Sequence, residues 1–122
     1  MNGSDSESAD ALSQRGIELL AAGEAIGAAR QFRAAIAADE NHIEAHHGLV
    51  RALRDAGKLE EAIGVALRLT VLTPHDPLAH TALSISLQHA GHISEAEAAA
   101  ARARVLEWKL ALQSPSGAEN SL

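Results

Sequence analysis

The sequence of 122 residues contains no cysteine and almost no aromatic side chains. The absence of cysteine excludes disulfides, a thiolate nucleophile and a zinc site built on thiolates. Tyrosine is also absent, and the chain has one phenylalanine and one tryptophan. Alanine, leucine, isoleucine and valine must therefore fill the core, which suits closely packed helices better than a sheet sandwich. The composition favours an all-α fold.

Positive charge is scarce as well. Ten lysines and arginines stand against sixteen aspartates and glutamates, which gives a formal net charge of -6. This balance argues against nucleic acid or an anionic membrane surface as the main partner. Long apolar runs are missing too, because Arg68 interrupts the best candidate, residues 63–72, and no insertion into a membrane is expected. The first residues are acidic and polar, unlike a secretory signal, so we expect a cytoplasmic protein.

The two ends of the chain differ in composition from the middle. Residues 1–8 are acidic and polar, and residues 113–122 are mostly polar. Neither segment has enough apolar surface to offset the entropy lost on ordering, so both are predicted to be disordered tails. The remaining residues, 9–112, are long enough for one domain.

A period of 34 residues runs through this domain. Alanine-glycine pairs end at Gly23, Gly57 and Gly91, and each glycine has a leucine four residues before it and an alanine five residues after it. Each pair ends one helical pattern and precedes another, as expected where glycine takes the left-handed conformation that closes a helix. The predicted unit is helix, tight turn, helix.

Capping signals and apolar spacing together predict six helices. Asn41 and Ser94 each have a glutamate three residues later, which is the pattern of a capping box. Asp76 precedes Pro77, so that a good cap stands before a proline at the first helical position. The predicted helices cover residues 9–22, 25–38, 43–56, 59–72, 77–90 and 94–112.

A helical hairpin of this length and pattern resembles the tetratricopeptide repeat. The repeats would cover residues 9–42, 43–76 and 77–110. The small residue of the family's second helix is matched in all three, whereas its aromatic is kept only as Phe32 and its proline only as Pro74. The resemblance implies a right-handed α-solenoid of three hairpins with an extended last helix. Its concave surface, lined by the first helix of each pair, would hold a segment of another protein.

The family's groove positions can be carried over to this sequence. They are Asp10, Ser13, Ile17, Leu20 and Ala21 in the first repeat, Glu44, His47, Arg51, Arg54 and Asp55 in the second, and Leu78, Thr81, Ile85, Gln88 and His89 in the third.

Two arginines stand at the centre of this implied groove. Arg51 and Arg54 could pair with a carboxylate of the partner. The alternative is that both are solvated or pair with Glu44 and Asp55 on their own helix. Chaperone-binding members of the family clamp a C-terminal carboxylate with lysine and asparagine in the first repeat. Serine and isoleucine occupy those places here, so that clamp is not expected.

The last predicted helix carries two apolar stripes. One stripe should face the solenoid core and consists of Ala99, Ala103, Leu106 and Leu110. The other is predicted to be exposed and to form an interface for self-association or for docking to a larger assembly; it consists of Ala101, Val105, Trp108 and Leu112. The alternatives are that the tryptophan folds back over the last hairpin or that the end of the helix frays.

Seven histidines invite a metal site, but their spacing discourages one. His46 and His80 are equivalent positions one repeat apart, too distant to share an ion. His89 and His92 are within one turn but lack an evident third ligand nearby in the sequence. The sequence also lacks a phosphate-binding loop, a zinc-protease helix and a nucleophile elbow. We expect no metal, no cofactor and no enzymatic activity.

The leading interpretation is a protein-protein interaction module, working as a scaffold, adaptor or assembly factor. A second interpretation is a small structural subunit that self-associates or docks into a larger complex through its last helix. A metal-handling protein built on the histidines is a third.

Overall fold

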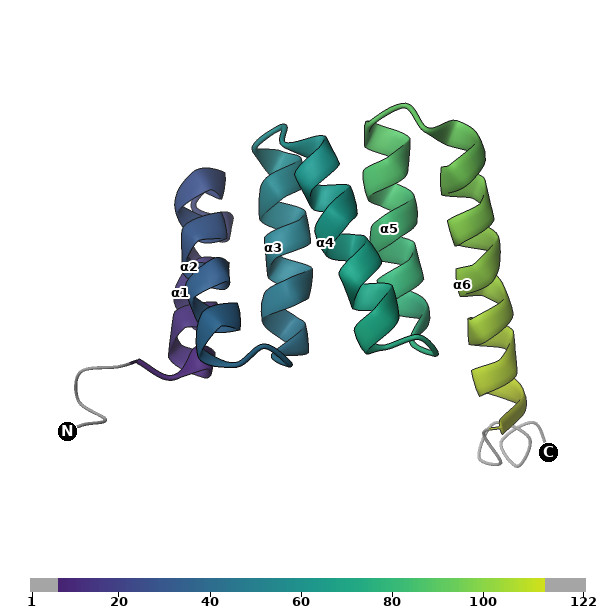
Figure 1. Ribbon diagram of the computed structural model, residues 1–122, viewed down its shortest axis with the longest axis horizontal. Helices are drawn as coiled ribbons and strands as arrows, with labels where there is room; N and C mark the ends of the chain where they lie inside the picture. Colours follow the sequence, from purple (N-terminus) through teal and green to yellow (C-terminus); the bar gives the residue numbers. More distant parts are fainter. Residues whose placement is uncertain (1–6, 114–122) are drawn as a thin grey trace.

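The structure is a computed structural model that describes residues 7–113. In this range the chain forms helices and no strand (Figure 1): α1 (Ala9–Ala21), α2 (Ala25–Ala38), α3 (Ile43–Asp55), α4 (Leu59–Leu72), α5 (Pro77–His89) and α6 (Ile93–Gln113). The prediction of an all-α fold is confirmed, and each predicted helix end lies within one residue of the observed end. The predicted tails, residues 1–8 and 113–122, lie outside the described residues except for Glu7, Ser8 and Gln113.

Each hairpin turns at a glycine in the left-handed conformation. The φ angles of Gly23, Gly57 and Gly91 are 80°, 77° and 86°. At the first turn the backbone N–H of Glu24 donates to the carbonyl of Leu19 at 2.9 Å, and the same bond recurs at the other two turns. This bond closes the end of a helix and satisfies a carbonyl that has no partner inside it. The 34-residue period is therefore a period of identical turns.

Two helices begin at side-chain caps of the usual kind. The Oγ atom of Ser8 accepts a hydrogen bond from the N–H of Ala11 at 3.0 Å at the start of α1. Asp76 caps α5 as predicted, because its Oδ1 accepts from the N–H of Leu78 at 2.9 Å. These bonds satisfy N–H groups that the first turn of a helix leaves without partners.

The two predicted capping boxes are wrong. At α3 the cap is His42, whose Nδ1 accepts from the N–H of Ala45 at 3.1 Å, and Asn41 lies one residue outside. The imidazole nitrogen does here what a carboxylate or hydroxyl oxygen usually does. The last helix begins at Ile93, so Ser94 lies inside its first turn.

The helices pack in two rows. Among the first helices of the three hairpins, α3 contacts both α1 and α5, while α2 contacts α3 and α4 contacts α5. In the view of Figure 1, α2 and α4 lie in front of the first row. The repeat alanines Ala28, Ala62 and Ala96 are buried, which lets neighbouring helices approach closely. We call the surface over α2, α4 and α6 the outer face.

The only phenylalanine fills the junction between the first and second repeats. Phe32 on α2 is fully buried, and its ring lies over Gly16 on α1 and Gly48 on α3. A Cβ atom at either glycine would come closer than 3.0 Å to the ring. One repeat later Ala66 takes the place of the phenylalanine, and Leu69 is fully buried on the same helix. The small Ala66 and the large Leu69 together indicate that volume lost at one core position is compensated at its neighbour one turn away.

No helix within residues 7–113 is long and apolar enough to cross a lipid bilayer.

Candidate protein-binding groove

A hollow of about 240 Å³ lies between the first helices of the second and third repeats. We call it the α3–α5 groove. Six of the residues predicted from the sequence meet in it, three from each helix. Its lining consists of His47, Val50, Arg51 and Arg54 from α3 and Leu78, Thr81, Ala82 and Ile85 from α5.

The two arginines differ in their surroundings. Arg51 is exposed, and its Nε lies 3.8 Å from Oδ2 of Asp55 one turn along α3. Arg54 is half-buried and makes no ion pair with any residue in the range 7–113. Arg51 therefore has a long, exposed contact with its own helix, whereas Arg54 makes no direct ion pair; whether either arginine binds a partner stays a prediction.

Partial burial changes the pKa of Arg54. It lowers the pKa of the guanidinium; Asp55 opposes this shift and Arg51 adds to it. Arginine begins from so high a pKa that the side chain stays protonated near neutral pH. The groove thus holds a partly desolvated cation that makes no direct ion pair with a described residue, although the charge of Asp55 acts on it. Such a cation binds a carboxylate more strongly than a fully solvated one.

His47 brings a second polar group without a partner. Its Nε2 atom is buried and makes no hydrogen bond. Burial lowers the pKa of the ring from its ordinary value of 6.5, Asp76 opposes this shift and His46 adds to it. The ring is therefore neutral at physiological pH. A buried nitrogen with no hydrogen bond carries a desolvation cost.

The α5 side of the groove is mainly apolar. Leu78 is exposed, and Ile85 and Thr81 are half-buried. An apolar side chain of a partner would cover this wall while a carboxylate faced the arginines. The arrangement has the features of a binding surface, with no pair of groups placed for acid-base or nucleophilic chemistry.

The first repeat contributes less to this surface than predicted. Ser13 is fully buried and its Oγ makes no hydrogen bond, so its assignment to the groove is wrong. This position lies on the flank of α1, which contacts both α2 and α3, and a serine is too short to emerge there. Leu20 is partly buried against the core. Ile17, Asp10 and Ala21 are exposed, but they do not line the α3–α5 groove.

Three other predicted residues lie at the surface away from this groove. Glu44 is exposed at the start of α3. Gln88 lines a separate hollow between α5 and α6. His89 is exposed, and its ring nitrogen Nδ1 lies 2.8 Å from the carbonyl oxygen of Ile85. A partner-binding role for these three stays a prediction.

The end of α6 is exposed on more than one side. Ala99, Ala103 and Leu106 are buried as predicted, but Leu110 is 49% exposed, so its assignment to the core stripe is wrong. The helix has 21 residues against 13 in its neighbour α5. At a rise of 1.5 Å per residue it is about 12 Å longer, so its last turns have no neighbouring helix to cover them.

The second stripe of α6 is uncovered within the described part of the chain. Trp108 is 62% exposed, and Ala101, Val105 and Leu112 are exposed as well. In the structure the tryptophan does not fold back over the last hairpin, and the helix continues to Gln113. Whether this stripe is an interface stays a prediction.

The histidines make separate contacts. His46 and His80 place Nε2 2.8 Å and 3.1 Å from the carbonyl oxygens of Glu40 and Pro74. Within residues 7–113 no group of three or more histidine, aspartate or glutamate side chains has the geometry to hold a metal ion.

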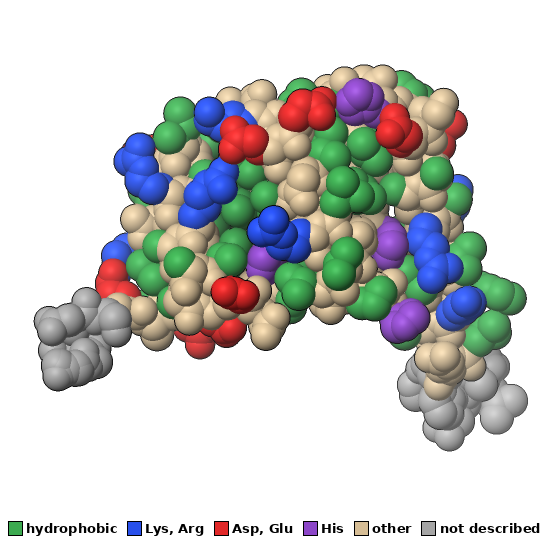
Figure 2. Space-filling model, viewed as in Figure 1, with side chains coloured by type: hydrophobic (Ala, Val, Ile, Leu, Met, Phe, Trp, Pro, Cys, Tyr) green, Lys and Arg blue, Asp and Glu red, His purple; other side chains and the backbone are tan. Residues whose placement is uncertain are grey.

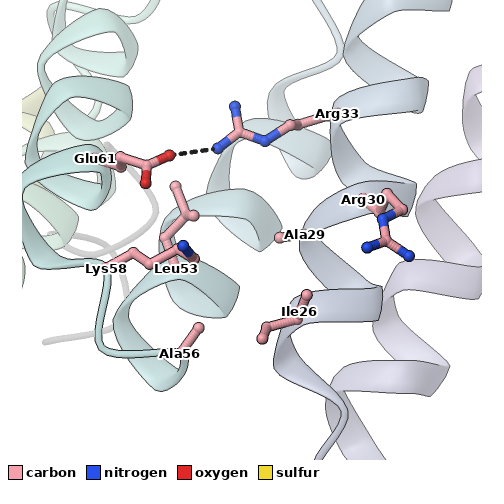
Figure 3. Close-up of a pocket in the computed structure, with 8 residues that line it drawn as sticks. All are labelled: Ile26, Ala29, Arg30, Arg33, Leu53, Ala56, Lys58 and Glu61. Atoms are coloured by element: carbon pink, nitrogen blue, oxygen red, sulfur yellow. Dashed lines mark hydrogen bonds and ion pairs between the residues drawn. The ribbon is translucent and has the colours of Figure 1, made fainter.

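Two further hollows on the outer face were not anticipated from the sequence. The first outer hollow, of about 330 Å³, lies between the first and second repeats and is shown in Figure 3; it is lined by Ile26, Ala29, Arg30, Arg33, Leu53, Ala56, Lys58 and Glu61. The second outer hollow, of about 390 Å³, lies between the second and third repeats and is lined by Ile63, Leu67, His80, Leu83, Leu87, Glu95, Ala98 and Ala99. The 34-residue period of the sequence could have shown that the two hollows are lined by equivalent residues.

Three stacked helical hairpins of 34 residues, turned at left-handed glycines, define a helical repeat protein. A family model of the tetratricopeptide repeat matches residues 19–85, more than half of the sequence. The chain belongs to the tetratricopeptide repeat family, as the resemblance implied. Members are typically interaction modules without catalytic activity, and protein-protein interaction is the class of function that the family supports.

Two solved structures have a similar fold. The crystal structure of MamA has a TM-score of 0.79 and 22% sequence identity; the match covers 85% of this chain and 61% of MamA. The Yersinia enterocolitica type III secretion translocator chaperone SycD, in an alternative dimer, has a TM-score of 0.76 and 20% identity; the match covers 93% of this chain and 83% of SycD. At these identities the likeness shows the fold alone. This chain spans about three-fifths of the length of MamA. No curated protein sequence matches the chain.

Proposed function

We propose that the protein binds a segment of another protein in the α3–α5 groove and works as a scaffold, adaptor or assembly factor. The observation that carries this proposal is the meeting of Arg51 and Arg54 with Leu78 and Ile85 across one hollow. The preferred segment carries a carboxylate for the arginines and an apolar side chain for α5.

Further observations support the proposal. Arg54 is half-buried and makes no direct ion pair with any of residues 7–113. The tetratricopeptide repeat family binds proteins, and SycD, which shares the fold, is named as a chaperone. A cytoplasmic location and the absence of catalysis stay predictions from the sequence.

The test is affinity capture from native lysate, followed by titration of the recovered protein or its binding segment. Arg51→Ala combined with Arg54→Ala should weaken binding by about tenfold or more, because both guanidinium groups face the bound carboxylate. The matched control is Arg68→Ala with Arg102→Ala, which removes the same charge from exposed positions outside the groove. Equal affinity of both double variants would overturn the proposal.

A second candidate is a structural subunit that self-associates through the end of α6. The exposure of Val105, Trp108 and Leu112 favours it, since tryptophan often dominates the energy of an interface. The molar mass in solution, measured by light scattering over a range of concentrations, tests it. A dimer that becomes a monomer in the Trp108→Ala variant would support this function, and a monomeric wild-type protein would contradict self-association.

A further inference from the structure

The two outer hollows are built from equivalent residues. Four residues of the second hollow stand 34 positions after four residues of the first, so the helices present them in the same register. The pairs are Ala29 and Ile63, Arg33 and Leu67, Leu53 and Leu87, and Glu61 and Glu95. One hollow can therefore be used to interpret the other.

The first outer hollow is crossed by an ion pair. Nη2 of Arg33 on α2 donates to Oε1 of Glu61 on α4 at 2.9 Å, and Figure 3 shows the guanidinium reaching over the hollow to the carboxylate. Arg30 and Lys58 also line this hollow. The glutamate thus meets a cation that the chain itself supplies.

The second outer hollow has the glutamate without that cation. Leu67 stands where the arginine would be, and neither arginine nor lysine lines the hollow. The side chain of Glu95 is 72% exposed. The basic group beside it is His92, whose Nδ1 lies 3.8 Å from Glu95, while its Nε2 lies closer to Glu60, at 3.2 Å. The carboxylate is therefore open to a cation from another molecule.

The walls of the second outer hollow are apolar. Ile63 and Leu87 are buried at its base, and Leu67 is 50% exposed at its side. His80 contributes a ring whose Nε2 lies 3.1 Å from a backbone carbonyl oxygen, so one of its two nitrogens already has a partner. Figure 2 shows hydrophobic side chains over the part of this face where Figure 1 places α4, α5 and α6. A hollow of about 390 Å³ has room for an aliphatic side chain.

We propose that the second outer hollow binds a peptide segment of another protein that carries an aliphatic side chain close to an arginine or lysine. The aliphatic side chain packs against Leu67 and Leu87. The basic side chain takes the place at Glu95 that Arg33 takes at Glu61. Charge complementarity selects this occupant, because the hollow offers one carboxylate and no competing arginine or lysine. The site lies on a different face from the α3–α5 groove and prefers the opposite charge, so it does not depend on the proposed function.

The test begins with a displayed library of random short peptides selected on the wild-type protein. Peptides that also bind the Leu67→Arg variant are then removed. The added arginine fills the hollow and reproduces the pair of the first outer hollow. We expect the remaining peptides to carry leucine, isoleucine or methionine near arginine or lysine. For synthetic copies, Leu67→Arg should weaken binding by about tenfold or more, and Glu95→Gln by about twofold to fivefold.

Matched variants separate this site from its surroundings. Val71→Arg adds the same side chain to a more exposed position on α4 outside the hollow and should leave binding unchanged. Glu97→Gln is the control for Glu95→Gln, since Glu97 lines a different hollow. Circular dichroism checks that each variant folds. The proposal is overturned if no selected peptide depends on Leu67, if the dependent peptides are acidic, or if Val71→Arg weakens them equally.

Discussion

At the junction between the first and second repeats, Phe32 fills the core and the next residue, Arg33, crosses the outer hollow to a glutamate. At the junction between the second and third repeats the equivalent neighbours are Ala66, fully buried, and Leu67, half exposed. From the first junction to the second, the buried residue loses its aromatic ring and the exposed residue next to it loses its charge. The turns and helices around them stayed the same.

The difference between the junctions distinguishes buried residues, which stabilise the solenoid, from exposed residues, which form its binding surface. The buried member of each pair meets only the chain itself, so a change in its size must be compensated within the core. The exposed member meets solvent or a partner, so a change in its charge alters recognition at little cost in stability. A shared repeat fold therefore does not imply a shared ligand, even between two junctions of one chain.

The strongest test of the comparison removes the aromatic ring from the first junction. Phe32→Ala should lower the free energy of unfolding by about 3 to 5 kcal/mol, since it leaves a cavity between α1, α2 and α3. Urea denaturation measures the loss. Leu67→Ala is the control at the second junction, and its smaller loss follows from its exposure. Similar losses for the two variants would contradict the assignment of core and surface.

A smaller effect is expected where a glycine makes room for that ring. Gly48→Ala should cost about 1 to 3 kcal/mol because the added methyl group would overlap Phe32. Gly64→Ala is the matched control, because Gly64 lies on α4 with nothing within 4 Å of an added Cβ atom. That variant should gain about 0.5 to 1 kcal/mol. Thermal or urea unfolding of both proteins decides between overlap and a general intolerance of alanine.

The surface pair of the first junction should matter less. Arg33→Leu gives the first outer hollow the leucine of the second and breaks an exposed ion pair, with an expected loss of about 0 to 1 kcal/mol. Urea denaturation at low and high salt measures this loss, and salt should shrink the difference from the wild type. A loss comparable to that of Phe32→Ala would show that the ion pair is part of the core.

The smallest effect concerns the groove, where His47 in the second repeat corresponds to Thr81 in the third. Burial lowers the pKa of His47, so the unfolded chain binds a proton more readily than the folded chain. The stability that this residue contributes is present above pH 6.5 and is lost as the pH falls below that value. His47→Gln should therefore flatten part of the fall in stability on acidification. Unfolding midpoints at several pH values, compared with those of the wild type, test this; identical pH profiles would refute it.

Much of the fold could be predicted because local chemistry repeats. Glycine at three equivalent positions is needed for a left-handed turn, and the apolar spacing between those positions suits helices and no other element. The cap at α3 was missed because a histidine ring nitrogen serves there, and histidine is not a usual cap. The assignment of Ser13 to the groove was wrong because the sequence pattern does not show how closely the neighbouring helices pack around so short a side chain.

The candidate sites were predicted in part. The family pattern placed Arg51, Arg54 and Leu78 on one surface, and the structure brings them into one hollow. The pattern says nothing of the outer face, where the informative feature is the replacement of Arg33 by Leu67 in a pair of equivalent hollows. That contrast requires knowing which glutamate the arginine reaches, and this contact joins residues 28 positions apart.

Because α6 extends beyond α5, hydrogen exchange in its last turns can show whether another molecule is bound there. Amide hydrogens there are covered by no second helix, so they should exchange with deuterated water far sooner than those around Leu69. A molecule that binds over Trp108 would slow this exchange, so a slower time course would indicate binding.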